Sequence, residues 1–220
     1  MSTKKYGLYL LIGALFILLA LSIGAGVAYG IKVPERYIYI DPGHGGFDGG
    51  AVSKDGLLQE KKLTLDISIK LKNKLEKFGY SVLLTRYTDR SLGKTKREDI
   101  LKRVELLESD SVIMYISIHA NAYPSEVVHG AQVFYKDNEE NKKLSDKIQS
   151  FLKEIDSTNH RTAKSITGKY LIDNTKKIGC LVEVGFLSSP FDLENLQQKT
   201  YQDELVTMIT LGIINYLGER

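Results

Sequence analysis

The sequence predicts an α/β fold, a three-layer α/β/α sandwich with a mostly parallel or mixed sheet. Strand-like and helix-like segments alternate from Pro34 onward, as they do where helices cover both faces of one sheet. One run, 111–118, is almost continuously apolar, which is typical of a strand covered on both faces. The chain has 220 residues, enough for one ordinary domain and a short appendage.

The expected elements follow one another in a regular order. A β-rich run at 37–41 ends at Pro42-Gly43, and a helix follows at 58–78, where apolar residues recur at helical spacing before Gly79. The other expected elements are strands at 80–85, 111–118, 131–135 and 178–184, a weaker strand at 169–172, and helices at 94–108, 139–155 and 201–217.

The amino-terminal appendage is an apolar segment. Residues 6–31 carry no charge and follow Lys4 and Lys5. A helix of this length spans a hydrocarbon core of roughly 30 Å, so the sequence predicts a cytoplasmic stub and transmembrane anchor at 1–33 and one domain at 34–220. The alternative is a cleaved signal peptide, whose apolar region is usually about 7–15 residues. The two lysines predict that the domain lies outside the cytoplasm.

The charge balance argues against a nucleic-acid-binding protein, and the cysteine count excludes a domain held by an internal disulfide. Three lysines and no acid precede residue 35, which leaves 27 basic and 27 acidic residues in the remainder. A domain without excess positive charge is not expected to bind nucleic acid. Cys180, the one cysteine, cannot form an internal disulfide, and its apolar neighbours predict a buried thiol.

Residues that can carry chemistry lie where the expected strands end. His44 stands between glycines after the first strand, and His119 ends the long apolar run. Glu183 is embedded in the apolar segment 179–186, and Glu60 opens the first long helix. Ligands of α/β sheets collect beyond the carboxyl ends of the strands, so we expect these side chains to meet there.

Two histidines and a carboxylate with an open fourth position are the usual ligands of a catalytic zinc ion, and a further glutamate can act as the base. Each residue alone has another interpretation. His44 can be an ordinary loop residue, His119 a satisfied core histidine, and Glu60 a first-turn glutamate that favours the helix dipole. Glu183 differs, because a carboxylate among apolar residues is costly to bury unless it is paired, metal-linked or protonated.

Other polar residues are expected to have structural roles. Arg86 and Asp89 follow the second strand, and we expect them to pair with each other rather than to bind a substrate. His129 and His160 lie in polar, loop-like contexts and are interpreted as solvated or structural residues. The loop at 50–57 is short, with no added helix that would block the cleft.

Three sequence motifs resemble those of the zinc-dependent N-acetylmuramoyl-L-alanine amidases (amidase type 3). They are Ile40-Asp41-Pro42-Gly43-His44-Gly45-Gly46, Ile116-Ser117-Ile118-His119-Ala120-Asn121 and Leu181-Val182-Glu183-Val184-Gly185-Phe186-Leu187-Ser188, in the order found in that family. The resemblance implies a Zn²⁺ cofactor held by His44, Glu60 and His119, with Glu183 as the catalytic base. Asn121, in the second motif, is a candidate substrate contact.

The resemblance also implies a biological setting. One amino-terminal anchor and a bare catalytic domain look most like the spore-cortex amidases, which cut the bond between muramic acid and L-alanine before muramic δ-lactam formation. The expected partners are peptidoglycan, a membrane and an exported accessory protein, and the expected location is the intermembrane space of the forespore. Ser188-Ser189-Pro190 departs from the family's frequent Ser-Asn-Pro. Two alternatives remain, a zinc peptidase acting within the stem peptide and an inert wall-binding or activator module.

Overall fold

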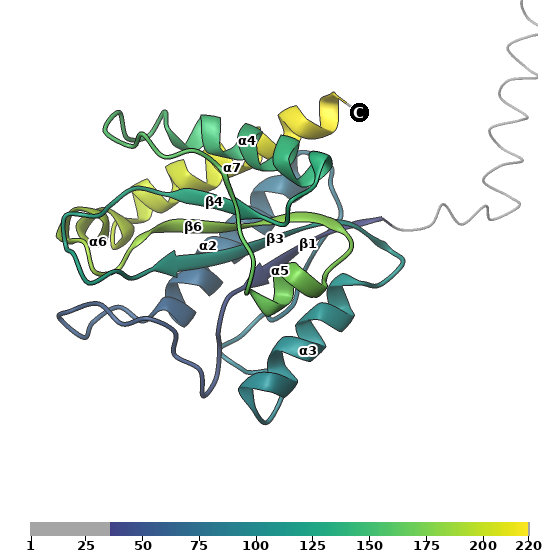
Figure 1. Cartoon of the computed structure of the whole chain (residues 1–220), viewed down its shortest axis with the longest axis horizontal. Coiled ribbons are helices and arrows are strands. Elements are labelled where there is room, and N and C mark those ends of the chain that lie inside the picture. Colours follow the sequence, from purple (N-terminus) through teal and green to yellow (C-terminus); the bar gives the residue numbers. More distant parts are fainter. Residues whose placement is uncertain (1–35, 220) are drawn as a thin grey trace, which may run out of the picture. The chain divides into compact units, whose positions relative to one another are not determined.

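Six strands form one mixed sheet in the order β2-β1-β3-β6-β4-β5. The computed structural model describes residues 36–219 (Figure 1). Strands β1, β2, β3 and β6 run parallel, whereas β4 is antiparallel to β6, and β5 follows the direction of β4. The strands are β1 (Tyr37–Pro42), β2 (Val82–Leu84), β3 (Val112–Asn121), β4 (Gln132–Tyr135), β5 (Lys164–Ser165) and β6 (Ile178–Phe186).

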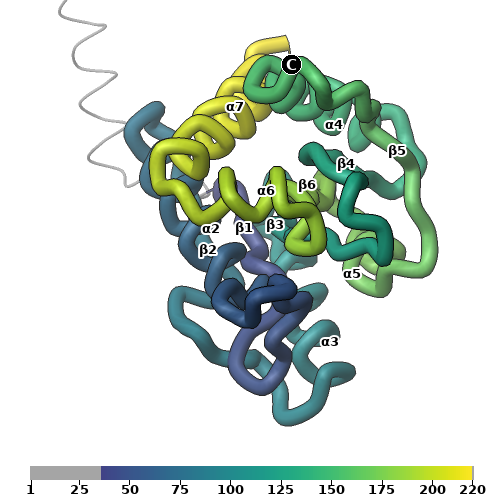
Figure 2. Tube along the Cα trace, turned by 90° about the vertical axis from the view of Figure 1, so that its left-hand side faces the viewer, coloured from purple at the N-terminus to yellow at the C-terminus, as the bar shows by residue number. Residues whose placement is uncertain are grey.

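Helices cover both faces of this sheet, which confirms the expected three-layer α/β architecture. Helices α2, α4 and α7 pack together on one face, and α3 and α5 lie on the other (Figures 1 and 2). The helices are α2 (Glu60–Lys77), α3 (Lys96–Leu107), α4 (Glu139–Leu152), α5 (Tyr170–Asn174), α6 (Pro190–Leu196) and α7 (Lys199–Gly218).

Alternate residues of the central strands pack against the two helical layers on opposite faces of the sheet. In β3, Ile116 and Ile118 point into the large apolar core beneath α2, α4 and α7, whereas Tyr115 belongs to a smaller cluster beside α3 and α5. Successive side chains of a strand point to opposite faces, so Ser117 and His119 share the face of Tyr115. The face with α3 and α5 therefore carries the polar residues of the central strand.

The expected strand at 169–172 is wrong, because this segment begins the short helix α5. Leu171 and Ile172 are adjacent and both buried in the smaller apolar cluster. A strand covered on only one face cannot bury two adjacent side chains, whereas one helical turn can. Thr175 closes the helix by donating its backbone N–H and its hydroxyl to the carbonyl of Leu171.

Two short elements escaped the sequence analysis, β5 and α6. Strand β5 has only two residues, both exposed, and so carries no apolar pattern. Helix α6 had a recognisable signal, since the hydroxyl of Ser189 accepts a hydrogen bond from the N–H of Asp192 and Pro190 occupies the first turn.

No helix within residues 36–219 is long and apolar enough to cross a membrane. The anchor expected at 1–33 lies outside the described residues, and so does the expected boundary between residues 33 and 34. Residues 36–219 themselves pack as one compact unit.

Candidate active site

The candidate site forms at the carboxyl ends of β1, β3 and β6. The strand register places Asp41 beside Ser117 and His119 beside Glu183. Paired residues of neighbouring parallel strands point to the same face, so these four side chains all lie on the side of α3 and α5. The pairing shifts after His119, where Asn121 is next opposed by Phe186, and this irregularity ends the regular ladder at the site.

His44 lies in the loop that leaves β1, and its backbone is in the left-handed region with φ of 61°. A non-glycine residue in this region is strained unless its surroundings hold it there. The glycine before it is required for another reason. A Cβ on Gly43 would lie 2.5 Å from Cε1 of the His119 ring, so any side chain would displace that imidazole.

Glu60, the first residue of α2, joins the two histidines. Its Oε2 lies 3.0 Å from Nε2 of His44, and its Oε1 lies 3.0 Å from Nδ1 of His119. The same carboxylate accepts hydrogen bonds from the backbone N–H groups of Ala51 and Ala120. A Cβ on Gly50 would lie 2.5 Å from Oε2 of Glu60, so the loop before α2 must also remain bare at this point.

The three side chains suit a metal ion. One ligand atom from each of His44, Glu60 and His119 can be chosen so that all lie within 4.8 Å of one another. Two imidazole nitrogens and a carboxylate oxygen are a donor set that zinc prefers. Each histidine exposes 23% of its side chain, whereas Glu60 exposes 6%, so the imidazoles are open to the cleft above a buried carboxylate.

The second nitrogen of His44 is also held. Its Nδ1 lies 2.9 Å from Oδ2 of Asp48, so both ring nitrogens face carboxylates. Burial lowers the pKa of His44, but the hydrogen bonds to Glu60 and Asp48 outweigh burial and raise it above its ordinary value. With a metal at Nε2, the Nδ1–H bond to Asp48 fixes the ring orientation, as such partners do in metalloproteins.

The pKa values of the two glutamates of the site are shifted in opposite directions. Burial raises the pKa of Glu60, but hydrogen bonds from His119 and His44 outweigh it and hold that pKa far below its usual range. Burial raises the pKa of Glu183, and the charges of His119 and Lys169 only partly oppose it. The Oε2 atom of Glu183 is buried and has no hydrogen-bond partner. A buried carboxylate oxygen without a hydrogen-bond partner is unusual in a purely structural residue, so Glu183 is a candidate functional residue.

Comparisons with known proteins identify the family of this chain. A profile of the N-acetylmuramoyl-L-alanine amidase family matches residues 38–215, nearly the whole described part of the chain. The protein belongs to this amidase family. It is 39% identical over 201 residues to the germination-specific N-acetylmuramoyl-L-alanine amidase of Bacillus subtilis, covering 87% of this chain and 84% of that relative.

Two further relatives are similar to this chain over most of its length. The amidase LytC of Bacillus subtilis is 32% identical over 200 residues, which cover 89% of this chain but only 38% of LytC. The CwlD amidase from Clostridioides difficile, solved in complex with the GerS lipoprotein, superposes with a TM-score of 0.81 at 37% identity. That alignment covers 84% of this chain and 100% of CwlD.

Two buried arginines of the amidase, Arg86 and Arg103, contact the loop that carries His44, and Arg103 was not among the residues considered from the sequence. Arg86 donates to the carbonyls of Pro42 and Gly43, and Arg103 donates to those of Pro42 and His44. Three consecutive carbonyls of the strained loop are thus held by two guanidinium groups. The arginines also correct one expectation, because Asp89 pairs with Lys61 and the N–H of Gly46 instead of with Arg86.

Asp41 balances one of these charges. Its carboxylate lies 2.7 Å from Nη1 of Arg103 and accepts hydrogen bonds from the hydroxyls of Thr85 and Ser117. Burial raises the pKa of Asp41, but Arg103 and the two hydroxyls outweigh it and lower the pKa below its ordinary value. Burial, together with the nearby charge of Arg103, lowers the pKa of Arg86 to about 10.

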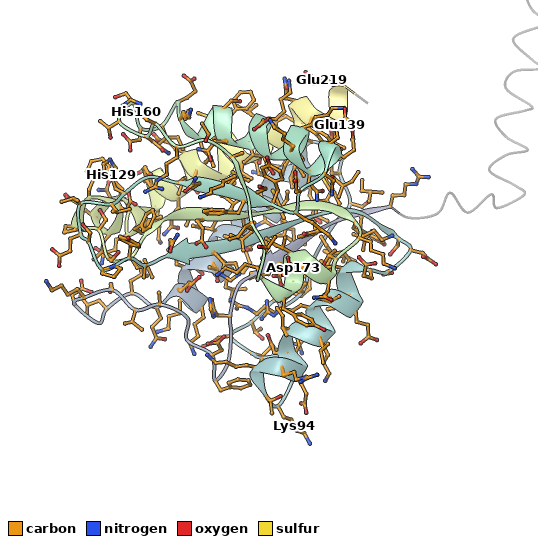
Figure 3. All side chains as sticks on the ribbon, in the orientation of Figure 1. Lys94, His129, Glu139, His160, Asp173 and Glu219 are labelled. Atoms are coloured by element: carbon orange, nitrogen blue, oxygen red, sulfur yellow. The ribbon has the colours of Figure 1, made fainter. Side chains whose placement is uncertain are left out.

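The other predicted residues lie outside this cluster. Asn121 ends β3, and its side chain accepts a hydrogen bond from the N–H of Ala122. His129 and His160 lie in loops (Figure 3), and His129 contacts the hydroxyl of Thr158 and the ring of Phe191. Cys180 is fully buried, as expected.

Proposed function

We propose that this amidase is zinc-dependent, with His44, Glu60 and His119 as the metal ligands and Glu183 as the base. The observation that carries the proposal is the cluster of His44, Glu60 and His119, with Glu183 beside His119 in the strand register. The substrate bond is the amide between N-acetylmuramic acid and the L-alanine of the stem peptide, in keeping with the activity of the family.

The residues divide the chemistry between them. Zinc at this site supplies polarisation of the substrate carbonyl and acidification of water. Glu183 takes the proton from the attacking water and delivers it to the alanine nitrogen as the C–N bond breaks, and general acid–base assistance of this kind contributes about 10²–10⁴-fold. Burial favours the protonated form of Glu183, which suits a group that must hold a proton between the two steps.

The supporting residues keep the ligands in place. Asp48 orients the His44 ring through Nδ1, and Arg103 holds the backbone carbonyl of His44. We assign a substrate contact to Asn121, which ends β3 close to His119 in the sequence.

We further propose that the enzyme acts on spore cortex from an amino-terminal anchor. The support is the resemblance to a germination-specific relative and the uncharged run at 6–31 after two lysines. This arrangement would place the domain outside the cytoplasm, in the intermembrane space of the forespore. The solved complex of CwlD with a lipoprotein supports an exported accessory partner for this enzyme as well.

The chemistry is tested by digesting purified peptidoglycan with the protein, with and without added zinc. We expect intact stem peptides with a free L-alanine amino group and glycan strands with bare muramic acid. Cleavage inside the stem peptide, detected by mass spectrometry of the products, would instead indicate a peptidase.

The metal assignment is tested with His119→Ala, which should lose both zinc and activity. His160→Ala is the matched control, since His160 is exposed and lies outside the ligand cluster. A full equivalent of zinc retained by His119→Ala would exclude His119 as a ligand.

The cortex role is tested in a spore former that lacks its germination-specific amidase. Expression of this chain should restore muramic δ-lactam in the cortex, and the Glu183→Gln variant should not. Unrestored δ-lactam at normal protein levels would separate the enzymatic activity from the proposed setting.

A further inference from the structure

A cavity of about 160 Å³ lies beside the candidate zinc ligands, on the face of the sheet that carries α3 and α5. His44 and His119 line one part of it, and Ile100 of α3, Leu171 and Ile172 of α5 and Leu181 of β6 line another. Pockets for drug-sized ligands usually measure about 300–1,000 Å³. This cavity is smaller than such pockets, so it suits a short part of the substrate.

The charged residues that line the cavity are almost all neutralised within the protein. Arg103 pairs with both Asp41 and Asp99, and Lys96 pairs with Asp48. Lys169 is different, because no ion pair is formed by this side chain within residues 36–219. Its ammonium group is the lining cation that remains available to a ligand.

The position of Lys169 fits this role. It is the residue before α5, is exposed to solvent, and lines the same cavity as both histidines. A ligand that binds this ammonium group therefore lies next to the reacting centre.

Arg161 also lies beside β6, but its guanidinium already has partners. Its guanidinium lies 4.7 Å from the ring centre of Phe186, and it donates to the side chain of Gln132 and the carbonyl of His129. A guanidinium with these partners gives up several contacts before it can bind an anion, whereas Lys169 gives up none.

We propose that this cavity is a subsite for the stem peptide and that Lys169 binds a carboxylate there, next to the cleaved bond. The inference rests on the amidase activity. In stem peptides, L-alanine is followed by D-glutamate joined through its side-chain carboxyl, so one free carboxylate lies one residue from the cleaved amide. Lys169 thereby makes the enzyme specific for peptides in which this carboxylate is free rather than amidated.

The test uses two glycan substrates that differ only at this group, one with D-isoglutamate and one with D-isoglutamine as the second peptide residue. We expect the wild-type enzyme to prefer the carboxylate substrate by about tenfold in kcat/KM, the effect of one hydrogen bond to a charged group. Lys169→Met should abolish this preference by raising KM for the carboxylate substrate alone. Lys169→Glu should reverse it.

Lys164→Met is the matched control, since Lys164 is an exposed lysine of β5, close to Lys169 in the sequence, that does not line the cavity. It should keep the wild-type preference. The proposal is overturned if the wild-type enzyme does not discriminate, if Lys169→Met discriminates as well as the wild type does, or if Lys169→Met loses activity on both substrates equally.

Failure of the amidase activity itself would be distinguishable. The Glu183→Gln variant binds without cutting, so calorimetric titration with the two substrates measures the subsite separately from catalysis. Tighter binding of the D-isoglutamate form, lost in the Glu183→Gln, Lys169→Met double variant, supports the subsite. Equal binding of both forms overturns it.

Discussion

The two faces of the central sheet come from the same strands but do different work. Ile116 and Ile118 of β3 pack into a large core under α2, α4 and α7, whereas Ser117 and His119 face the cleft beside α3 and α5. One face is apolar throughout its length. The other is apolar only near the start of the strands and becomes polar toward their carboxyl ends. Because strand residues alternate, the protein can change its chemistry on one face without altering the packing of the other.

The largest effect should separate the faces by activity. Glu183→Gln keeps the shape of the side chain but removes its ability to take a proton, so activity should fall by about 10²–10⁴-fold. Its neighbour Val184 is fully buried in the large core. Val184→Ala should cost about 2 kcal/mol in the free energy of unfolding and leave the activity of the folded enzyme unchanged.

Peptidoglycan turnover and urea unfolding of both variants provide these two measurements. Normal turnover by Glu183→Gln would remove this residue from the chemistry. Loss of turnover by a folded Val184→Ala protein would show that the two faces are not independent.

The next effect concerns the buried ion pair under the polar face. Asp41→Asn leaves Arg103 buried with less compensating charge, which should reduce the free energy of unfolding by about 3–5 kcal/mol. Asp203→Asn removes an exposed pair with Lys70 on the other side of the protein and should leave the free energy of unfolding nearly unchanged. Equal stabilities of the two variants in urea unfolding would contradict the importance of the buried pair.

The pH dependence of stability sharpens the same point. The folded-state pKa of Asp41 is lowered, so its contribution is complete above the unfolded-state pKa of about 3.9 and is lost as the pH falls through the folded-state value. The stability difference between the wild type and Asp41→Asn should therefore be constant at neutral pH and should shrink below about pH 3.9. A difference that stays constant down to the acid transition would show that Asp41 is not ionised in the folded protein.

The smallest expected effect tests whether solvent and small reagents reach the large apolar core of the folded protein. Burial raises the pKa of the Cys180 thiol to about 12, so the thiol is protonated and covered at pH 8. We expect a thiol reagent to modify Cys180 only after unfolding by denaturant. Rapid modification of the native protein would indicate that the large core opens readily.

Much of the site could be predicted from the sequence because its ligands follow apolar strands. His44 stands between glycines and His119 ends a buried run, and both positions are ones at which a histidine meets a ligand. Glu60 is different, because a glutamate at the start of a helix has an ordinary explanation, and the family resemblance was needed to assign it as a metal ligand.

The supporting residues could not be predicted in the same way. Arg103 lies in a helix rich in charged residues, where an arginine is expected to face solvent, and yet it is buried against Asp41. Its partner is 62 residues away in the sequence, so no local pattern marks the pair. Helix α5 was missed for a related reason, since five residues are too few to establish a helical period.

The hydrogen bond from Arg103 to the carbonyl of His44 has a consequence for the order of folding and metal binding. The two residues are 59 positions apart, and Arg103 holds the carbonyl of a residue whose backbone is left-handed. A nascent chain that has been synthesised only as far as the first motif therefore contains the imidazole of His44 but lacks the Arg103 contact to its backbone. Binding of the proposed zinc ion would then follow the docking of α3, and zinc would stabilise only molecules that have already completed this part of the fold.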